Sequence, residues 1–103
     1  MDSTKYMLCN ELTDSICELL SKCGEVTGLN NQCTIKYLRN LAINFNSLEE
    51  LLELKYSLTI LHRLGLLELS YNLVCKFDLL CDIYRMKERG ELVDRIYTSI
   101  KYR

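Results

Sequence analysis

The chain contains no proline and only four glycines among its 103 residues. A β-sandwich or barrel of this length needs many tight turns, and such turns use glycine, proline or asparagine–glycine. Helices need few of these residues, and they use glycine chiefly at the position just after the last turn. The sequence therefore predicts the all-α class, with helix ends near the few glycines present.

Apolar residues in the first part of the chain recur at three- and four-residue spacing, which predicts an amphipathic helix over residues 3–23. Thr13 and Asp14 are both good capping residues, so this stretch forms either one helix or two. Gly24 takes the position expected after a last turn. Residues 24–32 are polar, non-periodic and glycine-containing, and we expect a loop there.

A second apolar stripe predicts a helix over residues 34–45. The segment Ser47–Glu50 has the pattern of a capping box, in which the two side chains satisfy free backbone N–H groups at a helix start. We expect a short helix from there to about Leu54. Another helix is expected over residues 56–64, with Gly65 as its stop.

Ser70 is the expected cap of the longest helix, which continues to about Glu88. Arg89–Gly90 is expected to break it, and a final helix over residues 91–102 is then expected to bury Leu92, Ile96 and Ile100. These elements amount to five or six helices with short connections. They predict one domain spanning residues 1–103, folded as a compact antiparallel bundle.

The formal net charge is −1, and it is unevenly distributed along the chain. Residues 1–33 carry −3, whereas residues 85–103 carry +3. A small nucleic-acid-binding domain normally has a strong basic excess, so the overall balance argues against that class. The basic C-terminal segment is the one feature that favours nucleic-acid binding, so a nucleic-acid-binding helical domain is a minor alternative.

No stretch approaches the roughly 18 consecutive apolar residues of a membrane span. Residues 1–5 lack the basic-then-apolar layout of a signal peptide. The sequence thus predicts a cytoplasmic protein in a reducing compartment, where its six cysteines remain free thiols in buried or half-buried positions.

Catalytic and metal-binding patterns are absent from the sequence. The cysteines include no Cys-x-x-Cys pair, and the single histidine, His62, lies in a leucine-rich helical stretch. No glycine-rich phosphate loop occurs either. We therefore expect neither an enzyme nor a bound metal, cofactor or small-molecule substrate. The remaining expectation is a protein–protein interaction domain.

The segment Asp82–Val93 is densely charged with both signs, and it resembles the end of the fifth helix and the start of the sixth in death effector domains. Arg89-Gly90-Glu91-Leu92-Val93 corresponds to the family's Arg-x-Asp-Leu-Leu, with glutamate in place of aspartate. Residues 57–67 are similar to the family's fourth helix and the turn after it. Residues 38–45 are similar to its second helix.

This resemblance implies a death-fold bundle that assembles with like domains in apoptotic or innate-immune signalling, as an adaptor or as a decoy. The contact residues that it implies are basic and acidic groups at the expected junction, with an acidic cluster as the complementary face: Arg85, Lys87, Arg89 and Glu91, and Glu49, Glu50 and Glu53. The alternative is an unrelated helical protein that modulates a host, for example a viral one, or an obligate dimer acting through an apolar groove.

Overall fold

The computed structural model describes residues 2–27 and 32–101, and these residues form four helices. They are α1 (Asp2–Thr27), α2 (Gln32–Asn44), α3 (Leu48–Arg63) and α4 (Tyr71–Lys101). No strand occurs within the described ranges, so the predicted all-α class is confirmed. The predicted count of five or six helices is not, because two expected breaks, near Lys55 and at Arg89–Gly90, lie inside continuous helices.

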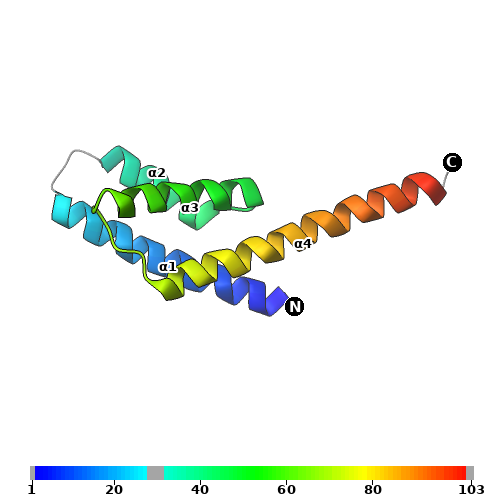
Figure 1. Ribbon diagram of the computed structural model, residues 1–103, viewed down its shortest axis with the longest axis horizontal. Helices are drawn as coiled ribbons and strands as arrows, with labels where there is room; N and C mark the ends of the chain where they lie inside the picture. Colours follow the sequence, from blue (N-terminus) through cyan, green and yellow to red (C-terminus); the bar gives the residue numbers. More distant parts are fainter. Residues whose placement is uncertain (1, 28–31, 102–103) are drawn as a thin grey trace.

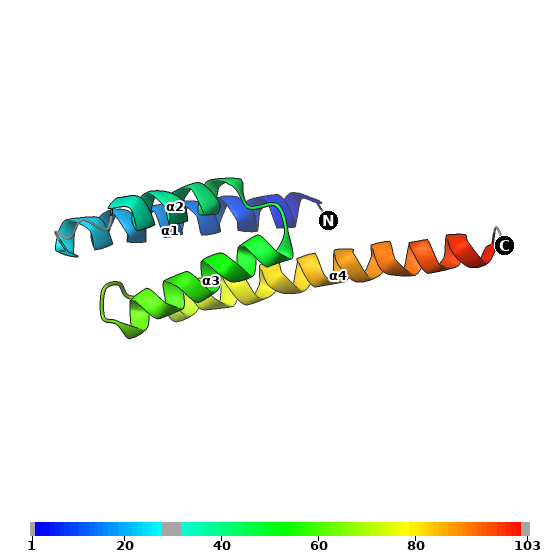
Figure 2. The same ribbon diagram turned by 90° about the horizontal axis from the view of Figure 1, so that it is seen from above.

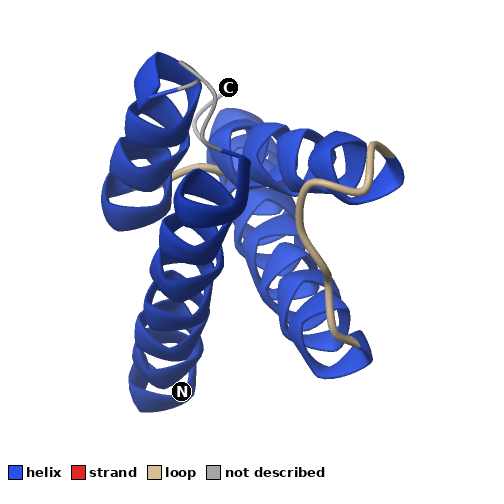
Figure 3. Cartoon of the chain, turned by 90° about the vertical axis from the view of Figure 1, so that its left-hand side faces the viewer, coloured by secondary structure: helices blue, strands red, loops and turns tan. Residues whose placement is uncertain are grey.

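The helices form two antiparallel hairpins, α1 with α2 and α3 with α4, which stack on each other (Figure 2). Contacts also join α1 to α4 and α2 to α3, so the four helices surround a shared core, as the end-on view shows (Figure 3). The second half of α4 runs past the other helices without a neighbour (Figure 1). The molecule therefore measures 61 × 24 × 21 Å and is longer than the predicted compact bundle.

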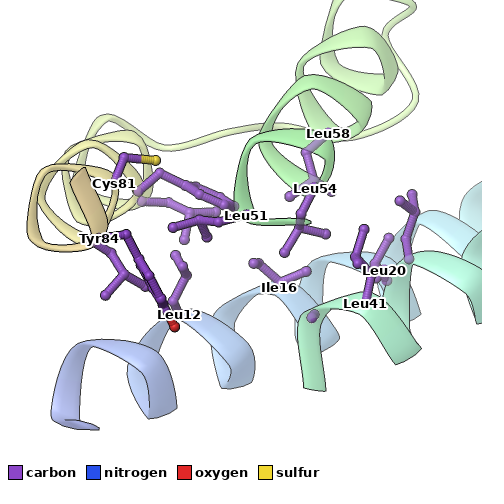
Figure 4. Close-up of a cluster of buried hydrophobic side chains, with 14 residues drawn as sticks. Leu12, Ile16, Leu20, Leu41, Leu51, Leu54, Leu58, Cys81 and Tyr84 are labelled. Atoms are coloured by element: carbon purple, nitrogen blue, oxygen red, sulfur yellow. The ribbon is translucent and has the colours of Figure 1, made fainter. Parts of the chain in front are cut away.

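The core lies where the apolar stripes of all four helices meet (Figure 4). Leu12 and Ile16 of α1, Leu54 of α3 and Leu80 of α4 are each completely buried. Thr13, considered above as a possible cap, instead lies inside α1, and its hydroxyl donates to the Ala42 carbonyl oxygen of α2 at 2.9 Å. The hydrogen bond to α2 thus accounts for a threonine in the interior of α1, where it does not act as a cap.

Local sequence signals set three of the helix ends as predicted. Ser47 caps α3 by accepting from the Glu50 N–H at 3.2 Å, and its hydroxyl also lies 3.2 Å from Glu50 Oε1. Ser70 caps α4 by accepting from the Leu73 N–H at 3.2 Å. Gly65 has a φ of +74°, the left-handed conformation that ends a helix most easily at glycine.

The expected break between Leu54 and Tyr56 is wrong, because α3 continues through Lys55. Its inward side chains Leu51, Leu54 and Leu58 keep one helical register across this point, and all are fully buried. A single helix keeps these core contacts and pairs the backbone N–H and C=O groups along α3. A break at Lys55 would leave some of these backbone groups without partners and would add no core contact.

The other two glycine stops were also wrong. Helix α1 passes through Gly24 and ends at Thr27, and α4 passes through Arg89–Gly90 to Lys101. Glycine inside a helix costs about 1 kcal/mol relative to alanine. At Gly90 the good helix formers on both sides, Arg89 and Glu91 among them, offset this cost. The interior of the loop expected at 24–32 lies outside the described residues at positions 28–31.

Candidate interaction surface

The core ends at Tyr84, which is the last buried side chain among those described in α4. Its ring makes an edge contact with Phe45 of α2, at a centroid distance of 6.4 Å, and Lys5 Nζ lies 4.4 Å from the ring centroid. Burial raises the pKa of the Tyr84 hydroxyl, and the neighbouring Cys9 thiol and Glu50 add to the shift. Tyr84 therefore closes the bundle at the point where α4 leaves it.

Residues 85–101 of α4 form what we call the α4 extension, which is roughly 25 Å long at 1.5 Å per residue. Every side chain described in this segment is exposed. Leu92 and Ile96, expected in the core of a separate final helix, are 56% and 52% exposed. That expectation is wrong, and the side chain of Ile100 lies outside the described part.

The four predicted contact residues Arg85, Lys87, Arg89 and Glu91 all belong to the α4 extension and are exposed. They do not lie at a helix junction. Their spacing places Arg85 and Arg89 one turn apart on one side of the helix, and Lys87 and Glu91 on the opposite side. No single flat face therefore holds all four charges. Arg85 pairs within its own helix, with Nη1 3.2 Å from Asp82 Oδ1.

The predicted acidic partners occupy the first turns of α3, beside the base of the α4 extension. Glu50 is engaged in the cap with Ser47, and Glu53 accepts a hydrogen bond from the Tyr37 hydroxyl, which raises the pKa of Tyr37. Glu49 is exposed. Within the described ranges no ion pair joins this cluster to the α4 extension.

The sequence reasoning missed a second apolar stripe on α4, which we call the outer stripe. Its members recur at alternating spacings of four and three residues along the helix: Leu79, Ile83, Met86, Gly90, Val93, Tyr97 and Ile100. Helical periodicity places these positions roughly half a turn from the buried side chains of the same helix. Leu79 is 50% exposed and Met86 is 68% exposed. The heptad spacing was the sequence signal that could have revealed it.

The cysteine thiols and the imidazole of His62 are the remaining reactive groups. Cys33 and Cys75 have exposed free thiols, contrary to the expectation of burial. His62 is exposed, and its Nδ1 lies 3.3 Å from the Leu69 N–H and 3.2 Å from the Leu67 carbonyl oxygen, within the turn before α4. In the described part of the chain, no His, Cys, Asp and Glu side chains cluster as a metal site.

An open surface hollow of about 470 Å³ lies between the end of α1 and the α3–α4 turn, lined by Leu19, Lys22 and Leu66–Ser70. A search of the described helices for a segment long and apolar enough to cross a bilayer finds none.

No protein-family model, curated protein or solved structure matches the chain.

Proposed function

We propose that this chain is a non-enzymatic protein-interaction domain, in which the bundle is a scaffold and the α4 extension is the recognition element. The observation that carries the proposal is the outer stripe, of which Leu79 is 50% and Met86 68% exposed, and which continues along a helix segment whose described side chains are all exposed. Solvent-exposed apolar stripes of this length are typical of protein contact surfaces. An isolated helix of this length is also only marginally stable in water, so a covering partner stabilises it.

Death-effector-like assembly is the more specific form of this proposal. The sequence pattern over Asp82–Val93 supports it, together with the opposite charges of the two chain ends. In that form, the charged side chains of the α4 extension meet the acidic first turns of α3 in a like domain. Contacts between two different surfaces then propagate from one copy to the next into an open assembly.

A dimer or host-modulating protein that binds through an apolar surface is the second candidate. The exposure of Met86, Leu92 and Ile96 favours it, because a charged contact does not require exposed apolar side chains. Both candidates place the partner on the α4 extension, in a reducing intracellular compartment.

Site-specific photo-cross-linking tests the general proposal. A benzophenone side chain is placed at Met86, which is 68% exposed. The matched control carries it at Leu64, which is 66% exposed and lies at the C-cap of α3, the end away from Glu49 and Glu53. In cells that naturally produce the chain, we expect defined protein adducts from position 86 and not from position 64. Absence of adducts at position 86, or the same adducts at both positions, contradicts a recognition role for the α4 extension.

A further inference from the structure

We propose that the partner of the outer stripe is a second copy of this chain, paired antiparallel along α4 in a closed, twofold-symmetric dimer. This inference rests on the proposed function, since it names the protein that the α4 extension binds. It differs from open death-effector-like assembly, because each copy uses the same surface.

The spacing of the outer stripe is that of a coiled-coil seam. Apolar positions at alternating intervals of four and three residues keep one face toward a partner helix, and here they run from Leu79 to Ile100. The bundle covers this face only in part: Ile83 is half-buried, whereas Leu79 is 50% and Met86 68% exposed. Lys76 of α4 pairs with Glu11 of α1 at 3.4 Å on one flank, and Lys55 of α3 pairs with Asp78 at 2.5 Å on the other. The outer stripe passes between these flanks, away from both neighbours.

Gly90 lies in the middle of this seam and favours the antiparallel direction. A Cβ added at Gly90 meets no atom within 4 Å, so the bundle does not require glycine there. A parallel pair places glycine opposite glycine and leaves a gap in the seam. An antiparallel pair places Gly90 opposite a larger apolar residue of the second copy, which fills the gap.

Charge complementarity selects one antiparallel register. When the twofold axis passes between Glu91 and Leu92, Gly90 faces the partner's Val93. The flanking Lys87 then lies beside the partner's Asp94, and symmetry repeats this attractive pair. Both side chains are exposed, and neither makes an ion pair within the described residues.

The neighbouring registers are disfavoured by like charges. Shifting the pairing by one heptad toward the bundle brings Lys87 against the partner's Lys87, and Arg89 against the partner's Arg89. Shifting it toward the C-terminus brings Asp94 against the partner's Asp94. Like charges held side by side oppose association, so the sequence disfavours both alternatives while it stabilises the central register.

The test is sedimentation equilibrium of the purified chain from roughly 1 µM to 1 mM, the range expected for a small interface. We expect the mass to rise from that of the 12.1 kDa monomer to twice that value and to stop there. Met86→Glu is expected to keep the chain monomeric. Leu92→Glu is the matched control, because Leu92 is exposed on the same segment but lies off the seam, and it is expected to dimerise normally.

Charge exchange tests the direction of pairing. Lys87→Asp and Asp94→Lys each turn two attractive pairs into repulsive ones, and each is expected to weaken dimerisation about tenfold. The double exchange restores opposite charges in the antiparallel register and should recover dimerisation to within about threefold. Arg95→Asp, a reversal on the side of the helix away from the seam, is the control and is expected to have no effect. Circular dichroism checks that each variant remains helical.

Three results overturn the inference. If the wild type remains a monomer throughout, a second copy is not the partner, and the proposed function then depends on whether a different protein is cross-linked at Met86. Mass that grows beyond a dimer contradicts a closed pair and favours open assembly. If the double variant dimerises more weakly than either single variant, the antiparallel direction is contradicted. That result is expected of a parallel pair, which sets Arg89 beside the partner's Asp94, so that Asp94→Lys places two positive charges side by side.

Discussion

Between Leu73 and Tyr84, α4 buries five side chains in the core, whereas no described side chain between Arg85 and Lys101 is even half-buried. The backbone remains helical across both halves. The first half is helical because it packs against the bundle. The second half is helical because its residues favour helix, and the described residues after Gly90 continue along the same axis. The comparison shows that the second half is not an unfinished part of the core, since its apolar residues follow a different face.

The largest expected difference between the two halves is in core packing. Phe77→Ala in the first half removes a side chain that is 2% exposed, and we expect a loss of about 3–5 kcal/mol in the free energy of unfolding. Met86→Ala in the second half should change it by less than about 0.5 kcal/mol. Urea unfolding at low protein concentration measures both. Similar losses in the free energy of unfolding for the two variants would contradict the division of α4 into a packed half and an unpacked half.

If Phe77→Ala does not fold, Leu80→Val replaces it as the milder core variant. Leu80 is fully buried in the same half. Its loss should still exceed the change measured for Met86→Ala.

The next difference is in the response to alkaline pH. Burial raises the pKa of Cys81 and of Tyr84 in the first half of α4, and burial also raises the pKa of Cys9 beside Tyr84. The folded state therefore retains these protons at pH values where the unfolded chain releases them. The free energy of unfolding should be constant below about pH 8.5 and fall as the pH rises above it.

Urea unfolding between pH 7 and pH 10.5 measures this decline, and Cys81→Ala is the matched variant. Removing the Cys81 thiol should make the decline shallower. Stability that rises with pH in this interval would show that the burial of these groups is wrongly assigned.

A smaller effect is expected at Gly90, within the second half. Gly90→Ala has room for the added methyl group and favours helix by about 1 kcal/mol at that position. We expect more helix by circular dichroism in the dilute monomer and no change in the unfolding of the bundle. If Gly90→Ala lowered the free energy of unfolding of the bundle, the view that the α4 extension folds independently of the bundle would be contradicted.

The sequence predicted correctly the helix ends that local hydrogen bonds and backbone conformation determine. It did not predict correctly whether a helix continues where packing against other helices determines this. Ser47, Ser70 and Gly65 act through hydrogen bonds and a φ value that their own residue types favour. Gly65 ends its helix because the chain after it returns to the core through Leu67 and Leu69. At the second glycine, Gly90, the described residues that follow make no such return, and α4 continues to Lys101.

The candidate surface was only half predictable for the same reason. The charged side chains described in the α4 extension are exposed, but their expected placement at a junction depended on the mistaken break at Gly90. The heptad spacing of the outer stripe is present in the sequence. It was hidden because Leu92, Ile96 and Ile100 also fit a short amphipathic helix facing a core. Only the packing of the bundle shows which face remains free.

Hydrogen exchange of individual amides in the dilute protein, followed by NMR, tests the division of α4 most directly. We predict that the amides of Phe77, Leu80 and Tyr84 exchange only when the bundle unfolds, and that those from Arg89 onward exchange many times faster. Raising the protein concentration should slow exchange in the second set and leave the first unchanged. Equal protection of both halves at low concentration would contradict an extension that is independent of the core.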